Sequence, residues 1–370
     1  MRFVLVLIFF LLLQMPAWAG LKIGVVLPLS GKEARRGETI RDFLLELNQR
    51  FYLRHGLHLK LLFYDSKGKP SRAVKAVEDA FFDGVRVIVG PLKPECAPRF
   101  YEKARSLGLP MVVTAGEINP MKYLREPPGP IFRTGVSSRA AVKTLYRCLK
   151  RRGYHRVGLL LTNDAFGREG EKWLKAYATE YAIKIVTKRY FGVHDTDVTV
   201  HLQALLSCEA VICWAPPRSS FVVARNLSQE AFNLPVFFSH LVAWEGFLRE
   251  SQGLYGRPFV GAAFLAEDNA PVDPEALAVW RSFVNRYDVL RDPALAAFAD
   301  ALIFIKTGAL RAGYRYWVRG LEKTGLVRGL TGLYFLSTDD HYGLLPGSVG
   351  VFRYQWLRYE PVCAPQAGVL

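Results

Sequence analysis

The stretch KIGVVLPLSG at residues 22–31 begins the pattern that decides the fold of this chain. Its first six residues form a nearly unbroken apolar run of strand length, and the Pro and Gly that follow favour a turn. A segment of helical period comes next at 34–51, and runs of strand length return at 58–63 and 85–89. Apolar strands that alternate with helices are typical of a parallel sheet with helices on both faces.

The same alternation continues over most of the chain. We predict further strands at 111–113, 157–161, 183–186 and 210–214, and further helices at 71–82, 95–107, 139–151, 169–182, 200–206, 221–232 and 294–310. Ser71 is a suitable N-cap for its helix, and Lys184 interrupts its strand, which favours an edge position. The Pro- and Gly-rich residues 127–130 separate two successive sets of units, so the sequence predicts two α/β lobes.

The N-terminal residues 1–19 have the order of a secretory signal peptide. Arg2 supplies a positive start, residues 3–13 are apolar throughout, and Ala17 and Ala19 form a small-x-small cleavage site. About eleven apolar residues are too few to span a membrane, and Pro16 breaks the helix just before the cleavage site. We therefore expect residues 1–19 to be removed and the protein to leave the cytoplasm.

Composition excludes several classes of protein. Hydrophobic residues make up 51% of the chain and charged residues 22%, as in an ordinary globular protein, so disorder is excluded. The formal net charge of +16 is dispersed without a long basic run, which indicates a solvated surface rather than a nucleic-acid interface. The length after residue 19 suits two domains.

Cysteine and histidine give no sign of a metal, a cofactor or catalysis. Five cysteines permit disulfides in an exported protein but leave at least one thiol unpaired. No Cys-x-x-Cys pair and no zinc-like His spacing occurs. Cys208 and Cys213 are expected to be small buried side chains rather than a bridge. Because no Gly-x-Ser-x-Gly elbow occurs either, we expect a protein that is not an enzyme.

Several short motifs follow one another along the chain and carry a resemblance. They are Pro28-Leu29-Ser30-Gly31 with Ala34 and Gly37, Tyr64-Asp65-Ser66 with Pro70, Val89-Gly90-Pro91, Asp164-Ala165-Phe166-Gly167-Arg168, Phe298-Ala299-Asp300-Ala301, and Gly329 with Gly332 and Phe335. In order and approximate spacing they resemble the type I periplasmic solute-binding proteins of ABC importers, most closely the branched-chain amino acid binding proteins. Their collinearity over 21–354 carries the resemblance, since no single motif is specific.

The resemblance implies an α/β fold of two Rossmann-like lobes, whose parallel sheets are flanked by helices and joined by three crossings. The crossings are expected near residues 134, 263 and 331, so that lobe 1 contains 21–134 and 264–331, and lobe 2 contains 135–263 and 332–370. The resemblance also implies a periplasmic monomer that captures a small amino-acid-like, carboxylate or aromatic solute between its lobes. Its partner would be an ABC permease in the inner membrane.

The expected ligand site lies beyond the carboxyl ends of the strands, as in other sheets of this type. From the family's ligand loops we expect contacts from Ser30, Lys93, Pro94, Glu95, Thr114, Ala115, Gly116, Glu117, Phe166, Trp214, Ser239 and His240. A helix N-terminus after Pro91 would hold an anion together with Lys93. Glu117 would receive an ammonium or amide donor, and Phe166 and Trp214 would sandwich a flat or apolar body.

The sequence departs from the amino acid binding pattern at three places. Pro94 stands where the family usually has Ser, and Glu117 or Ile118 stands near the usual Thr. No acid occurs at 239–241, where the family commonly receives the ligand's ammonium. Two alternatives stay open: His240 is either a ligand contact or a hydrogen-bonded structural residue, and Lys93 and Glu117 lie either in the site or in solvent.

Two other functions remain as alternatives. The same fold serves as a regulatory or sensor module, as in activators of cell-wall synthases and in the ligand-binding lobes of receptors. Those activators are commonly lipid-anchored, and the expected cleavage site is not followed by a cysteine. An exported hydrolase is less favoured, because no strand-end Ser has a convincing His and acid partner in the sequence.

Overall fold

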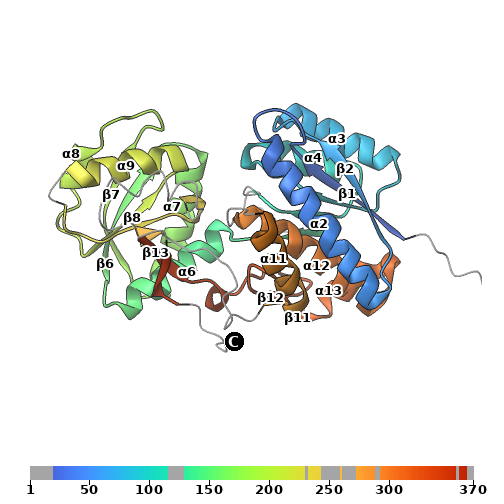
Figure 1. The fold of residues 1–370 in the computed structure, drawn as a ribbon. Coiled ribbons are helices and arrows are strands. Elements are labelled where there is room, and N and C mark those ends of the chain that lie inside the picture. The colour runs from blue at the N-terminus through green and yellow to red at the C-terminus, as the bar shows by residue number, and fades with distance from the viewer. Residues whose placement is uncertain are drawn as a thin grey trace, which may run out of the picture.

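The computed structural model of this protein describes residues 20–115, 129–229, 232–242, 259–260, 272–287, 292–355 and 358–364. Figure 1 shows two α/β bodies side by side, and the chain passes between them more than once. Blue and orange segments form one body, whereas green, yellow and dark-red segments form the other. The expected signal peptide at 1–19, the site residues Gly116 and Glu117, and the crossing near 263 lie outside the described residues.

The first body is built on a five-stranded parallel sheet in the order β2-β1-β3-β4-β5. Its strands are β1 (Leu21–Leu27), β2 (Leu59–Asp65), β3 (Val87–Gly90), β4 (Met111–Val113) and β5 (Ile131–Arg133). Alternate side chains of β1 point to opposite faces, as strand geometry requires. Ile23 and Val25 belong to the apolar cluster of α2 (Ala34–His55), whereas Val26 belongs to that of α3 (Pro70–Phe82) and α4 (Ala97–Ser106).

Helix α12 (Pro293–Ala312) lies in the core of the same body, against α2 and α13 (Trp317–Glu322). Among the described residues it is the one helix that is long and apolar enough to cross a membrane, yet 78% of that window is buried within the protein. Its apolar surface is therefore that of a core helix. The remaining helical elements here are η1 (Pro94–Cys96), α11 (Pro274–Tyr287) and η3 (Tyr314–Tyr316).

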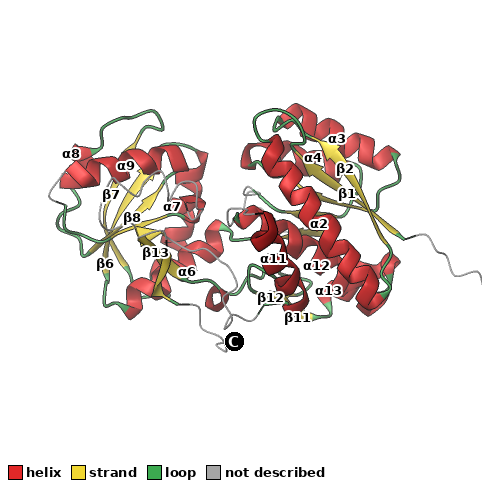
Figure 2. Ribbon diagram, in the orientation of Figure 1, coloured by secondary structure: helices red, strands yellow, loops and turns green. Residues whose placement is uncertain are grey.

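The second body repeats the architecture with a four-stranded parallel sheet in the order β7-β6-β8-β9. Its strands are β6 (Arg156–Thr162), β7 (Lys184–Phe191), β8 (Ala210–Trp214) and β9 (Val236–Phe238). The helical elements are α6 (Ser138–Arg151), α7 (Ala165–Ala178), α8 (Thr199–Gln203), α9 (Pro217–Gln229), η2 (His240–Val242) and η4 (Pro346–Ser348). Figure 2 shows the yellow strands of both bodies lying among red helices.

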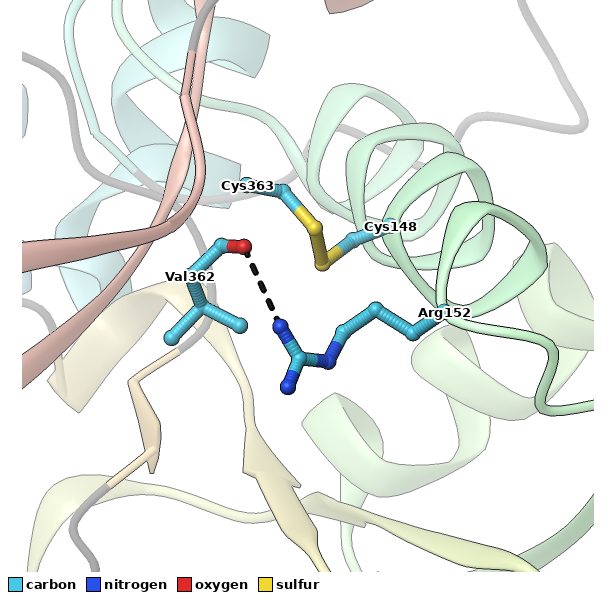
Figure 3. The surroundings of a disulfide bond; sticks show 4 residues. All are labelled: Cys148, Arg152, Val362 and Cys363. Carbon is cyan, nitrogen blue, oxygen red and sulfur yellow. Dashed lines mark hydrogen bonds between the residues drawn. A yellow bond between two sulfur atoms is a disulfide. The ribbon is translucent and has the colours of Figure 1, made fainter.

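Two small antiparallel sheets complete the fold. Strands β11 (Gly325–Arg328) and β12 (Leu333–Leu336) form a hairpin beside α13, and β10 (Phe259–Val260), β13 (Val351–Gln355) and β14 (Arg358–Cys363) form a sheet in the order β10-β13-β14. A disulfide between Cys148 and Cys363 ties β14 to α6 (Figure 3). The other three cysteines are free and buried, which confirms the expectation for Cys208 and Cys213.

The structure confirms the predicted fold class and corrects several local details. Strand β7 is an edge strand, as Lys184 indicated. A Cβ at Gly37 would lie 2.1 Å from the carbonyl oxygen of Pro28, so glycine allows α2 to approach the end of β1. Ser71 is not the N-cap of α3, because Pro70 already occupies its first position and Lys69 precedes it.

Candidate ligand site

The described members of the expected site follow strands of the two parallel sheets, except for Trp214, which is the last residue of β8. Residues 28–31, 91–95 and 114–115 come after β1, β3 and β4, and residues 163–167, 215–218 and 239–240 come after β6, β8 and β9. Each sheet therefore presents its members along one edge, where its carboxyl ends lie. Gly116 and Glu117 fall outside the described residues, so their proposed contacts remain predictions.

In the first body, Ser30 and Thr114 use their hydroxyl groups within the protein. The Ser30 hydroxyl donates to Asp65 Oδ2 at 2.5 Å, and the Thr114 hydroxyl donates to the carbonyl oxygen of Pro91 at 2.9 Å. Burial opposes ionisation of Asp65, but hydrogen bonds from Ser30 and from the backbone of Lys67 and Leu29 keep its pKa below the usual range. Both hydroxyls thus fix the loops at the strand ends.

Lys93 carries a charge that is already paired. Its Nζ lies 2.9 Å from Glu95 Oε1, and this hydrogen bond raises the pKa of Lys93. Pro94 starts only the three-residue η1, and the regular helix α4 begins at Ala97. The cation that we expected at a helix N-terminus is therefore neutralised locally by a half-exposed ion pair, which is worth little in water.

In the second body, three rings meet at the carboxyl ends of β6, β8 and β9. The Phe166 ring stacks on Trp214 with centroids 5.7 Å apart, and the imidazole of His240 lies 6.0 Å from Phe166 and 5.8 Å from Trp214. Trp214 is fully buried, and Phe166 is half-buried. The expected sandwich of a ligand between Phe166 and Trp214 is therefore not the arrangement found, because the two rings contact each other.

The position of Phe166 follows from local hydrogen bonds. Asp164 is the N-cap of α7, and its carboxylate accepts from the Thr162 hydroxyl at 2.9 Å and from the backbone N–H of Gly167 at 2.8 Å. The helix consequently starts at Ala165, earlier than the predicted residue 169. Phe166 therefore lies in the first turn of α7, at the edge of the sheet where the strands end.

His240 and Ser239 have different roles. The fully buried Ser239 hydroxyl donates to the carbonyl oxygen of Ala215 at 3.1 Å and supports the strand ends. His240 Nδ1 is buried and has no hydrogen-bond partner within the described part of the chain. Burial, together with the nearby Arg133 charge, lowers the pKa of His240 to about 3, so the imidazole is neutral at physiological pH.

Arg133 was not among the site residues expected from the sequence. It is buried at the end of β5, immediately before the chain leaves the first sheet, and its charge acts on His240 in the second body. The sequence does contain a signal for it: Arg133 is a charged residue directly after the apolar residues 131–132 of a strand. Strand ends at a sheet edge are where such a residue meets a ligand.

The described residues offer no site for a metal ion. They contain no group of three or more His, Cys, Asp or Glu side chains placed to hold one. The chemistry at the two sheet edges is instead that of hydrogen bonding, one buried guanidinium and an aromatic cluster. Such an arrangement can bind a small molecule.

Comparisons with known proteins point to one family and one fold. The family model described as periplasmic binding protein matches residues 20–345. A search of curated proteins found no match. Among solved structures, an ABC transporter substrate-binding protein from Sphaerobacter thermophilus is 17% identical with a TM-score of 0.77, and the match covers 93% of this chain and 97% of that one.

Two further solved structures are similar and contain ligands. A solute-binding protein of an ABC transporter from Rhodopseudomonas palustris, in complex with benzoate, is 16% identical with a TM-score of 0.71, over 95% of this chain and 98% of that one. The branched-chain amino acid binding protein LivJ from Streptococcus pneumoniae, in complex with isoleucine, is 15% identical with a TM-score of 0.70, over 93% and 100%. At these identities the likeness shows the fold.

Proposed function

Because the chain belongs to the periplasmic binding protein family, we propose that it is the extracytoplasmic solute-binding component of an ABC transporter. The observation that carries this proposal is the family match over 20–345 on a fold with two parallel sheets. Solved relatives of the same fold that are described as ABC transporter proteins support it. The expected signal peptide would deliver the chain to the periplasm, where it would act as a monomer without nucleic acid.

The bound solute is proposed to be small and amino-acid-like, carboxylate or aromatic. The charges at the sheet edges favour a carboxylate or an aromatic solute. A ligand ammonium near His240 would find no negative partner there, because the imidazole is neutral and Arg133 is positively charged. Phe166 offers a half-buried aromatic face to a flat or apolar body. Similar folds that hold benzoate and isoleucine fit this range of ligands. The twelve residues expected from the sequence remain the proposed contact set, with Arg133 added.

We retain the division into two lobes as a proposal and revise its third crossing. The boundary at 331 falls in the turn of the β11–β12 hairpin, and β13 pairs with β10 in the other body. These pairings support a third crossing after Leu336 and before Val351. In that segment Asp340 Oδ2 lies 2.6 Å from the guanidinium of Arg139 in α6. The His341 ring stacks on that of Phe132 in β5, with the ring centroids 4.0 Å apart.

The proposed mechanism is ligand-linked closure of the lobes about these crossings. A solute that contacts both lobes binds the closed form better and shifts the population toward it. The closed form is then the species that an ABC permease recognises. The lobes bind the solute and release it unchanged, so the protein is not an enzyme in this proposal.

Mass spectrometry of the compound released from purified, denatured protein would identify the ligand. Small-angle scattering with that compound should then show compaction of the protein, and the recovered compound should be chemically unchanged. A saturating ligand that leaves the scattering curve unaltered would contradict closure. Turnover of the compound would favour the hydrolase instead, and a chain that co-purifies with a regulatory partner but no solute would favour the sensor module.

A further inference from the structure

A group of cations lies at the edge of the second sheet where its strands begin, at the opposite end of the strands from the candidate ligand site. Arg147, Lys150 and Arg151 come from the last turns of α6, Arg156 starts β6, and Lys184 starts β7. Arg147 is half-buried and the other four are exposed. We call these five residues the basic edge.

The basic edge contains two juxtapositions of like charge. Arg147 and Arg151 are four residues apart on α6, and the pKa of Arg151 is lowered by burial and by the Arg147 charge. Arg156 and Lys184 are direct partners in the register of β6 and β7. Like charges in either relation destabilise the folded state by a few tenths of a kcal/mol or more. Folding stability therefore does not explain them.

The two juxtapositions belong to one continuous surface. The backbone N–H of Lys184 donates to the carbonyl oxygen of His155 at 2.7 Å, which holds the start of β7 beside the start of β6. The Arg147 charge acts on Tyr181, three residues before Lys184. Cations from three elements are thus gathered on one end of the second body.

Within the part of the chain that the structure describes, one carboxylate acts on this surface, and it lies beside Arg156. Glu209 is the adjacent carboxylate, and its Oε2 accepts from the backbone N–H groups of His155 at 2.7 Å and Arg156 at 2.9 Å. It therefore caps the start of β6, and the charge of Arg156 also acts on it. The other four cations of the basic edge form no ion pair with an acid among the described residues. A favourable helix dipole accounts for cations at the end of α6, but not for those at the starts of two strands.

We propose that the basic edge docks on the anionic phospholipid headgroups of a membrane surface. Arginine forks match phosphate oxygens in paired hydrogen bonds, and several cations on one face add their attractions to an anionic bilayer. Leu206 lies at the same edge, and its side chain is 56% exposed. It belongs to the turn before Glu209, whose backbone N–H donates to the carbonyl oxygen of Arg156 at 2.8 Å. An exposed leucine beside cations suits the apolar interface of a bilayer better than an acidic protein face.

This docking goes beyond the proposed transport function and does not require it. A protein held at the membrane by the strand-start end of its second body would keep the opposite edge, with Phe166 and His240, free for a solute. The weak attraction of a few cations would allow release and lateral movement, because such contacts are screened by salt.

Co-sedimentation with vesicles tests the proposal. The probes are vesicles of phosphatidylcholine alone and vesicles of phosphatidylcholine with phosphatidylglycerol in equal parts, at low and at physiological salt. The test variant is R147Q/K150Q/R151Q, and the matched control R86Q/R311Q/K323Q removes three exposed cations from the first body. Circular dichroism melts of each variant establish that it is folded.

We expect the purified wild-type protein to bind the phosphatidylglycerol vesicles and not the neutral ones, with binding that weakens as salt rises. The test variant should partition roughly fivefold more weakly for each cation removed, whereas the control should bind like the wild type. Equal loss in both variants would overturn the proposal, because net charge alone would then explain binding. Absence of vesicle binding, or binding to soluble poly-glutamate in its place, would overturn it too.

Discussion

The Tyr334 hydroxyl donates a hydrogen bond of 2.7 Å to the Asp300 carboxylate, and both side chains are fully buried. The same carboxylate accepts from the backbone N–H groups of Leu330 and Thr331, and the backbone N–H of Gly135 donates to the Tyr334 hydroxyl at 3.0 Å. Core helix α12, the β11–β12 hairpin and the segment at Gly135, where we propose the first crossing, are therefore held by one network. Breaking such a network leaves buried polar groups unsatisfied.

Replacing Asp300 with Asn should make the stability of the protein less dependent on pH. Burial raises the pKa of Asp300 to about 6, although its hydrogen bonds act in the other direction. The folded state thus binds this proton more tightly than the unfolded state. The stabilising contribution is complete below pH ~4 and is lost as the pH rises through about 6.

We expect Asp300→Asn to be destabilised at every pH, because an amide cannot accept from all of these donors. The difference in unfolding free energy between the wild type and this variant should shrink by ~2 kcal/mol from pH ~4 to pH ~7, because only the wild type loses stability over that range. Urea titrations at several pH values measure this change. Tyr334→Phe, which removes one donor and keeps the carboxylate, should retain the pH dependence and shift it to higher pH. A constant deficit for Asp300→Asn would show that the carboxylate stays ionised throughout.

Sequence patterns anticipated the architecture because local and global preferences agree in this chain. The buried strands β4 and β8 begin and end where their apolar runs do, and Gly37 stands where the carbonyl oxygen of Pro28 leaves no room for a side chain. Repeated strand and helix periods of this kind are local signals that a single sequence contains.

The site was less predictable because its chemistry depends on contacts between distant residues. Nothing near Ser30 in the chain indicates that its hydroxyl donates to Asp65, and nothing near Lys93 except Glu95 indicates its pairing. Arg133 acts on His240 across 107 positions (240 minus 133). The pairing of Cys148 with Cys363, at a sequence separation of 215, was likewise inaccessible from spacing.

Gly170 is predicted to be irreplaceable by alanine, although alanine normally favours a helix. A Cβ at this position of α7 would lie 2.2 Å from Cδ1 and Nε1 of the fully buried Trp214. Overpacking of this kind costs about 1–3 kcal/mol, which outweighs the ~1 kcal/mol gained in helix propensity. Denaturant titration of Gly170→Ala measures the net loss.

The double variant Gly170→Ala with Trp214→Phe is the control for this contact. A smaller ring should accommodate the new methyl group, so the two substitutions should be less destabilising together than the sum of their separate effects. Strict additivity would mean that Trp214 does not limit the space at Gly170, and a stabilised Gly170→Ala would contradict the packing described above.

The Cys148–Cys363 disulfide should stabilise the second body by anchoring the C-terminal strand to α6 (Figure 3). Replacing both cysteines with serine should lower the free energy of unfolding by about 2–5 kcal/mol, the usual range for loss of a native bridge. Thermal melts with and without a reductant provide the control. The reductant should lower the melting temperature of the wild type and leave that of the double variant unchanged. Equal effects on both proteins would argue against the bridge.

Phe166→Ala should weaken ligand binding more than Lys93→Ala does. Phe166 presents a half-buried ring beside His240, so its removal takes away a contact surface for a flat or apolar ligand. Lys93 is already paired with Glu95 at 2.9 Å, and an ammonium so neutralised has less to offer an anion. Calorimetry with the ligand released from the wild-type protein measures both effects. We expect on the order of tenfold weaker binding for Phe166→Ala, which corresponds to ~1.4 kcal/mol.

The conservative variant Phe166→Leu separates loss of the aromatic face from loss of volume, since leucine retains an apolar side chain there. If the ligand is aromatic, both Phe166 variants should lose most of the affinity. If it is aliphatic, Phe166→Leu should keep most of the affinity. If Lys93→Ala weakens binding more than Phe166→Ala, the Lys93–Glu95 pair must open on binding. The anion site would then lie at the first sheet, as the sequence alone suggested, and Arg133 with His240 would have only a structural role.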